Sequence, residues 1–210
     1  MRRTLCLSLL VFVSATLVAN AQSVVCLDTK IYDGASQPFI EHLGTGFFQS
    51  YLTMNLPYTP VKGLWKQLEK KLGRKLISRG EAHITVITPP EFTNGLDKKV
   101  SIQEIHKIAK KMKIQKSDFD VLCIGNGKKE IEGKVEETFF VVVQSADLMK
   151  IRKAVKKLFV KRGGDPSLFR PEKFYPHITI GFTKRDLHES DGVIKGDNSK
   201  DARFILEMSP

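Results

Sequence analysis

The word His-Ile-Thr occurs twice in this chain, at residues 83–85 and 177–179. Side chains alternate across a β-strand, so each word places an imidazole and a hydroxyl on one face. Two imidazoles in one cleft can cleave a phosphodiester without a metal, because one accepts a proton from the attacking oxygen while the other protonates the leaving oxygen. Threonine hydroxyls can donate to phosphate oxygens. We therefore predict that His83 and His177 are catalytic and that Thr85 and Thr179 bind phosphate.

The elements that position the two motifs also repeat. In the first half, an apolar strand at 51–56 precedes a helix capped by Thr59 and stopped by Gly73, and the strand "HITVITPP" follows. In the second half, the strand "ETFFVVVQS" precedes a helix that ends near Lys161, and "YPHITIGFT" supplies the motif strand. The matching order predicts a duplication, with lobes at about 47–100 and 135–185 of one domain spanning 22–210.

Other segments connect or extend these lobes. A capping box at Ser101 and Glu104 predicts a third helix, and "DFDVLCIGNGKKEIEGKVEE" predicts a hairpin whose turn contains the Gly-Asn-Gly at 125–127. The tail "DARFILEM" predicts a last strand. Gly181 shares the parity of the motif residues, so it either leaves space for a ligand or marks a β-bulge.

The remaining histidines and most basic residues have no matching partners. We predict that His42, His106 and His188 are surface residues. The basic residues of two helices, Arg152 among them, are interpreted as solvated faces or as a source of positive potential for an incoming nucleotide. No metal site is predicted, because the chain has no His-x-x-x-His or Cys-x-x-Cys spacing.

The amino-terminal residues have the pattern of a secretory signal peptide. Arg2 and Arg3 precede an apolar run that ends in Ala19-Asn20-Ala21, which predicts cleavage near Ala21 and a secreted product; an uncleaved anchor is the alternative. No later segment is long and apolar enough to span a membrane. The formal charge of +11 favours an anionic partner. In an oxidising compartment Cys26 and Cys123 either form a disulfide or remain two separate thiols.

The pair "HITV" and "HITI" resembles the two HxTx signatures of the 2H phosphoesterase superfamily, and the resemblance extends from about residue 47 to residue 185. It implies an α+β, bilobal, pseudo-twofold fold of the LigT type, in which antiparallel sheets line a central cleft and helices lie outside. It further implies His83 and His177 as the catalytic pair, Thr85 and Thr179 as the phosphate-binding pair, and no metal or cofactor. Known members include 2',3'-cyclic nucleotide and 2',5'-oligoadenylate phosphodiesterases.

These observations predict a secreted, metal-independent phosphodiesterase that acts on RNA-type nucleotides or oligonucleotides, with no membrane or protein partner implied. Tyr175, two residues before His177, either stacks on a base or packs in the core. Two other classes of function stay open. One is a catalytically silent nucleotide-binding or RNA-binding module of the same fold, and the other is a basic protein that coats RNA or anionic membranes.

Overall fold

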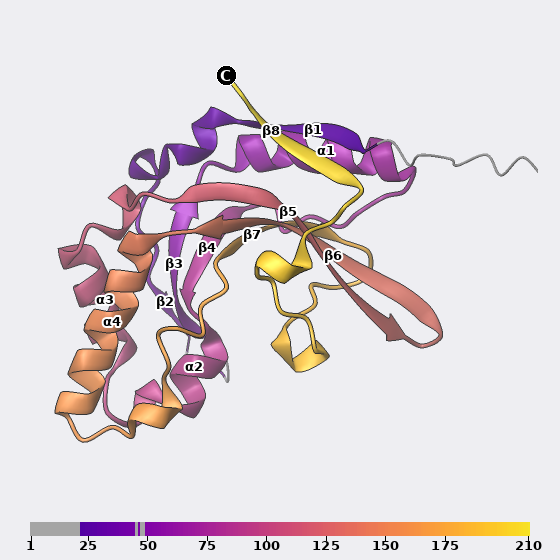
Figure 1. The fold of residues 1–210 in the computed structure, drawn as a ribbon. Coiled ribbons are helices and arrows are strands. Elements are labelled where there is room, and N and C mark those ends of the chain that lie inside the picture. The colour runs from indigo at the N-terminus through magenta and orange to yellow at the C-terminus, as the bar shows by residue number, and fades with distance from the viewer. Residues whose placement is uncertain (1–21, 45, 47–48) are drawn as a thin grey trace, which may run out of the picture.

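The computed structural model describes residues 22–44, 46 and 49–210, and the predicted signal peptide lies outside these residues. Two three-stranded antiparallel sheets form the centre of the molecule (Figure 1). The first has the order β2 (His42–Leu43), β3 (Ser50–Leu56) and β4 (Ala82–Ile87), and the second has the order β5 (Asp120–Ile131), β6 (Lys134–Gln144) and β7 (His177–Phe182). The strands β4 and β7 are edge strands of their sheets and contact each other, so the two His-x-Thr strands lie where the two sheets meet. The predicted α+β fold with antiparallel sheets is confirmed.

Four α-helices accompany the sheets: α1 (Tyr58–Leu72), α2 (Pro89–Asn94), α3 (Ile102–Lys111) and α4 (Ala146–Lys161). As predicted, α1 ends at Gly73, whose φ of 64° is the left-handed conformation that glycine adopts easily. Its start differs from the prediction, because Pro57 rather than Thr59 occupies the N-cap. The capping box of Ser101 and Glu104 opens α3 as predicted. Figure 1 shows α3 and α4 side by side at one edge of the molecule.

The two ends of the described chain meet in a separate parallel pair, β1 (Ser23–Asp28) and β8 (Phe204–Ser209), which lies beside α1 (Figure 1). The predicted last strand is therefore present, although its partner was not predicted. Cys26 in β1 binds the side chain of Gln67 through its backbone N–H and C=O, whereas Cys123 lies in β5 opposite Val142. Both cysteines are free thiols, so the structure does not contain the disulfide that was one of the two alternatives.

The predicted position of the hairpin turn was wrong. Gly125 and Gly127 lie within β5, and the chain turns at Glu132 and Gly133, which both have positive φ as in a type I′ turn. The two earlier glycines have a packing role instead. A Cβ on Gly125 would meet the Phe140 ring at 2.3 Å, and one on Gly127 would meet Val193 at 2.2 Å.

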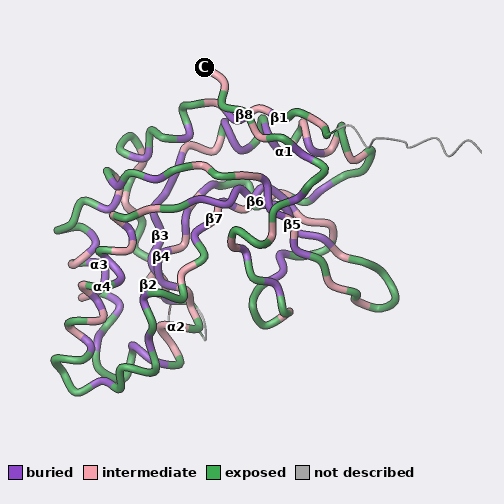
Figure 2. Tube along the Cα trace, in the orientation of Figure 1, coloured by how far each residue is buried: buried purple, intermediate pink, exposed green. Residues whose placement is uncertain are grey.

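The strand β6 separates the core from the face that carries the second motif. Phe139, Val141 and Val143 belong to the hydrophobic core, while the alternate residues Phe140 and Val142 point to the opposite face with His177. Figure 2 shows that the central strands are mostly buried and that exposed residues follow the outer sides of the helices and the β5–β6 hairpin tip. No helix of the described residues is long and apolar enough to cross a membrane.

Candidate active site

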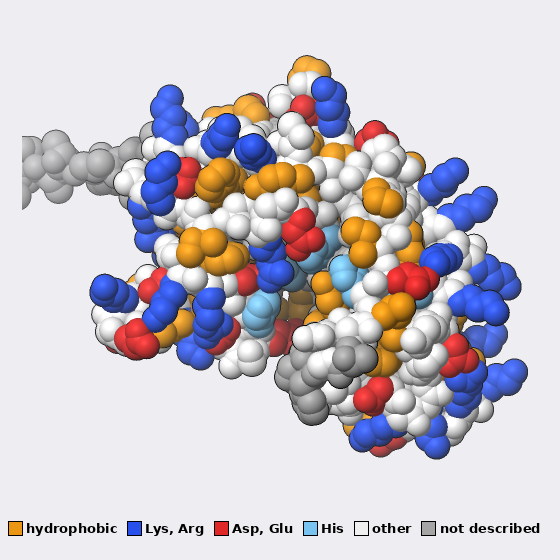
Figure 3. Space-filling model, turned by 180° about the vertical axis from the view of Figure 1, so that it is seen from behind, with side chains coloured by type: hydrophobic (Ala, Val, Ile, Leu, Met, Phe, Trp, Pro, Cys, Tyr) orange, Lys and Arg blue, Asp and Glu red, His pale blue; other side chains and the backbone are white. Residues whose placement is uncertain are grey.

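The face that carries both His-x-Thr motifs is built from strand pairs in matching positions. In the first lobe, His83 lies opposite Asn55 and Thr85 lies opposite Thr53. In the second lobe, His177 lies opposite Val142 and Thr179 lies opposite Phe140. Opposed residues of an antiparallel pair share a face, so each motif has a polar or aromatic neighbour on the adjacent strand. Histidine side chains gather around a hollow in the middle of the face shown in Figure 3.

His177 is held in one tautomer by the backbone. Its Nδ1 lies 2.8 Å from the carbonyl oxygen of Tyr175, and a carbonyl only accepts, so Nδ1 carries the proton in the neutral ring and Nε2 has the free lone pair. The ring also contacts Phe140 edge to face at 5.6 Å between centroids. Burial lowers the pKa of His177 to about 3, and the positive charge of Lys195 contributes. His177 is therefore neutral at neutral pH.

His83 has a different environment. Its Nδ1 lies 3.2 Å from Oε1 of Glu81, and its side chain is 15% exposed. A hydrogen bond to His83 lowers the pKa of Glu81, which burial by itself would raise. A carboxylate only accepts hydrogen bonds, so Nδ1 of His83 carries the proton that points toward Glu81. The two histidines thus face a carbonyl in one lobe and a carboxylate in the other, so the site is not electrostatically symmetric.

The two motif threonines are half-buried on the same strands. Thr179 donates its hydroxyl to Oδ2 of Asp186 at 3.3 Å. Thr85 lies opposite Thr53, whose hydroxyl is buried and donates to Oδ1 of Asn55 at 3.2 Å. The threonine that faces an acidic residue is therefore the one on the His177 strand.

Thr179 contacts a network of charged residues that no sequence motif predicted. Asp186 is buried and accepts from Lys195 Nζ at 2.7 Å and from Arg79 at 2.7 Å. Burial by itself would raise the pKa of Asp186, but the charge and hydrogen bond of Lys195, together with Arg79, lower it to about 2. Because Arg79 precedes β4 and Asp186 follows β7, the network connects the two lobes.

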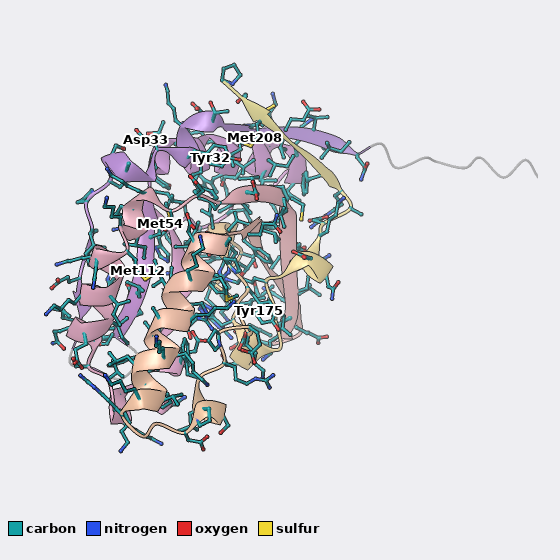
Figure 4. All side chains as sticks on the ribbon, turned by 60° about the vertical axis from the view of Figure 1, so that its left-hand side comes forward. Tyr32, Asp33, Met54, Met112, Tyr175 and Met208 are labelled. Carbon is teal, nitrogen blue, oxygen red and sulfur yellow. The ribbon has the colours of Figure 1, made fainter. Side chains whose placement is uncertain are left out.

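Tyr175 borders a cavity of about 980 Å³ that also reaches Pro176, the residue before His177. Val142, the strand partner of His177, lines the same cavity, although neither motif histidine does. Figure 4 shows Tyr175 beside the C-terminal segment, drawn in yellow, and its ring closely approaches Gly196. The ring is 37% exposed, so Tyr175 is available to a ligand and is not a core residue.

Gly181 does not leave space for a ligand. A Cβ at this position would lie 3.0 Å from the Ile77 carbonyl oxygen and 3.0 Å from the ring of Trp65. The register between β6 and β7 shifts between Phe139 and Phe140, leaving Ile180 without a partner. Of the two alternatives for Gly181, the structure shows the bulge, and this bulge turns the residue toward α1 and away from the face of Thr179.

Two of the three remaining histidines are not surface residues. His106 is buried, with Nε2 3.0 Å from the carbonyl oxygen of Tyr51 and an unpartnered Nδ1. His42 is half-buried, stacks on Tyr51 at 4.0 Å and places Nε2 3.2 Å from the Thr53 hydroxyl. It lies near the site, because Thr53 is the strand partner of Thr85. Burial, together with the charge of His83, lowers the pKa of His42. His188 is exposed, as predicted.

The interpretation of Arg152 as part of a solvated helix face was also wrong. Its guanidinium is 1% exposed, donates to Val86 at the end of β4 at 2.7 Å, and forms an ion pair with Glu91. It also donates to the carbonyl oxygens of Pro171 and Lys173 in the segment that enters β7. A buried guanidinium is tolerated when its donors are satisfied in this way. Arg152 therefore fixes the two motif strands relative to each other.

Sequence patterns could have pointed to part of this site. Thr53 and Asn55 alternate in an otherwise apolar strand, and Glu81 has the same parity as His83. Lys195, Asp186 and Arg79 carry no such signal, because they come from irregular segments. Among residues 22–44, 46 and 49–210, no three His, Cys, Asp or Glu side chains are grouped to hold a metal.

Comparison with known proteins agrees with this geometry. Residues 50–188 match the family model described as "Swiss Army Knife, 2H phosphoesterase domain", a range that contains both motifs and more than half of the chain. No curated protein and no solved structure matches the chain. The two His-x-Thr strands are edge strands in matching positions of the two sheets and contact each other. The chain belongs to the 2H phosphoesterase family.

Proposed function

We propose that this protein is a secreted, metal-independent phosphodiesterase that hydrolyses RNA-type substrates, either 2',3'-cyclic phosphate ends or 2',5'-linked oligonucleotides. The observation that carries the proposal is the juxtaposition of two His-x-Thr strands whose imidazoles have opposite environments. Phosphodiesterase chemistry follows from the family. The substrate class rests on the acid and base pair together with the basic chain, and secretion rests on the amino-terminal sequence pattern.

The surroundings of the two histidines support different roles. His177 is the general base, because it is neutral and its Nε2 is free to accept a proton. His83 is the general acid, because its Nδ1 faces the Glu81 carboxylate, which gives this ring a counterion where His177 has the Tyr175 carbonyl. Thr85 and Thr179 donate hydrogen bonds to the non-bridging phosphate oxygens and hold the phosphorus in line.

Hydrolysis of a 2',3'-cyclic phosphate then follows in one proton-balanced step. Nε2 of His177 takes a proton from water as the water oxygen attacks phosphorus. The bond between phosphorus and one ribose oxygen breaks, and His83 delivers its proton to that oxygen. The product is a nucleoside phosphate monoester, and proton exchange with solvent restores both rings. With a 2',5' linkage, the neighbouring ribose hydroxyl can attack instead of water and leave a cyclic phosphate.

Tyr175 supports a nucleotide as the group attached to the phosphate. Its exposed ring borders the cavity next to His177, where it can stack on a base. Base stacking on an aromatic ring contributes about 1–3 kcal/mol per base. We therefore expect Tyr175→Ala to raise KM for nucleotide substrates more than it lowers kcat.

The test is turnover of 2',3'-cyclic nucleotides, 2',5'-oligoadenylate and cyclic dinucleotides in EDTA. We expect at least one substrate to be hydrolysed by the wild-type protein. The His83→Ala and His177→Ala variants should each lose about 100-fold or more, the contribution typical of a positioned acid or base. Thermal unfolding midpoints show whether each variant is folded.

Three results would contradict the proposal. Turnover that disappears in EDTA would refute the metal-independent mechanism. Tight nucleotide binding without turnover of any substrate would support the silent binding module. Binding to RNA that weakens steeply with salt but is unchanged in both histidine variants would indicate a coating protein instead.

A further inference from the structure

Lys195 is a buried cation with unused hydrogen-bonding capacity. Its side chain is 4% exposed, and Asp186 is the one acceptor that its ammonium reaches among the described residues. An ammonium has three N–H donors, so two remain free. The ammonium also lies 5.5 Å from the centroid of the Phe140 ring, which contacts His177 edge to face. One aromatic ring, that of Phe140, therefore lies between the ammonium and the imidazole of His177.

The chain holds Lys195 in this position from both sides. Val193 packs onto Gly127 of β5, where a side chain on the glycine would clash. Gly196 lies against the ring of Tyr175, again at a distance that leaves no room for a side chain. With its neighbours fixed on the cavity wall, Lys195 points toward Asp186 and Phe140. A lysine held so firmly differs from the mobile, solvated lysines of the helix faces.

Lys195 shares its counterion with a second cation. Asp186 forms direct ion pairs with both Lys195 and Arg79, while the carboxylates of Glu81 and Asp191 act on these two cations from longer range. A buried ammonium that shares its counterion and keeps free N–H donors favours the approach of a further anion. A phosphodiester carries one negative charge, and Thr179 of the second motif already contacts the network through Asp186.

We propose that Lys195 binds a non-bridging oxygen of the reacting phosphate and stabilises the charge that develops on it in the transition state, with Asp186 as the residue that positions Lys195. This inference rests on the proposed function. It adds to the His-x-Thr pattern a catalytic residue from the irregular segment after β7, and it completes the site with a cation from outside the duplicated strands.

The kinetic test compares Lys195→Met, Lys195→Arg and the control Lys200→Met, using 2',3'-cyclic AMP or another substrate that the wild-type protein hydrolyses. Lys200 is an exposed lysine in the same segment. We expect Lys195→Met to lower kcat about 100-fold or more, as removal of one transition-state donor does. Lys195→Arg should recover about tenfold or more of that loss, because it keeps the charge. Lys200→Met should stay within about twofold of the wild type.

A binding test does not depend on turnover or on a variant that folds. Inorganic phosphate is titrated into the wild-type protein while the Lys195 Cε resonance is followed by NMR. We expect this resonance to shift and to saturate as phosphate is added. Lys195→Met, or the pair Lys195→Met and Asp186→Asn if the single variant unfolds, should bind phosphate at least about tenfold more weakly.

The outcomes separate this inference from the proposed function. If the wild type turns over substrate in EDTA and both histidine variants are inactive, but folded Lys195→Met keeps activity within about threefold, Lys195 has no catalytic role and the proposed function stands. If no substrate is turned over, the proposed function fails, and the NMR titration still decides whether Lys195 binds phosphate. A Lys195 resonance that does not respond to saturating phosphate overturns the inference.

Discussion

The pH dependence of the base depends on the charge of Lys195, and Lys195→Met measures this dependence directly. The distances from Lys195 to the Phe140 centroid and from that centroid to the His177 ring bound the separation of the two groups at about 11 Å. At that separation one unit charge contributes about 1.5 kcal/mol with an effective dielectric constant of about 20. This corresponds to about one pKa unit. We therefore expect Lys195→Met to raise the pKa of His177 by about one unit or more.

The sign of the effect on activity follows from the role of His177 as a base. The base works when it is deprotonated, so a raised pKa moves the acidic limb of the kcat/KM profile to higher pH. Activity at pH 4 relative to pH 7 should fall in Lys195→Met, because a pKa raised from about 3 by one unit leaves only about half of the His177 rings deprotonated at pH 4. Binding of an anionic phosphate compensates the same charge, so in the wild type the acidic limb of kcat should lie at higher pH than that of kcat/KM.

The assay is an NMR titration of the His177 imidazole at low salt, together with pH profiles of both kinetic constants. Lys200→Met is the matched control, because it removes one lysine charge from an exposed position in the same segment. The pKa of His177 also depends on the charges of Asp186 and His83, and that of Asp186 depends on Arg79. Both variants therefore keep these three residues. Equal His177 pKa values in the wild type and in Lys195→Met, within about 0.3 units, would refute this account of the site.

Four further substitutions test other parts of the structure. Glu81→Gln should lower kcat, because the carboxylate accepts a hydrogen bond from Nδ1 of His83 and orients the ring; an unchanged kcat contradicts this. Arg152→Met should cost about 3–5 kcal/mol in urea unfolding, because its buried acceptors lose their donor; a cost below about 1 kcal/mol would exclude this role. Gly125→Ala should lower the free energy of unfolding by about 1–3 kcal/mol, because its Cβ would lie 2.3 Å from the buried ring of Phe140. Gly63→Ala in α1 has open space around the new Cβ, so it should raise the free energy of unfolding by about 0.5–1 kcal/mol. Thermal unfolding measures both effects.

The elements around the motifs were predictable because their signals are local. Apolar spacing, a capping box and Gly73 define α1, α3 and α4 within a few residues, and the alternation in "HITVI" identifies the motif strand. The hairpin turn was mistaken because Gly-Asn-Gly has turn composition. Its glycines are needed instead for the close approach of Phe140 and Val193, which lie at other places in the chain.

Residues whose environment depends on distant segments were the ones misjudged. Arg152 looks like its lysine neighbours on a basic helix, but acceptors from Val86 to Lys173 converge on it. His106 likewise lies on a helix with lysines and is nevertheless buried against Tyr51. Composition describes such a helix correctly on average. It does not tell which single basic side chain the fold encloses.

The sequence by itself determined the duplicated His-x-Thr strands and therefore the two imidazoles and two hydroxyls, because side-chain alternation along a strand is a local property. Only the tertiary structure distinguished the two histidines. Burial and the charge of Lys195 keep His177 neutral, the Tyr175 carbonyl fixes its tautomer, and Glu81 accompanies His83. Burial and charge act through space, so the environment that distinguishes the two rings includes Lys195, which comes from a segment outside the motif strands.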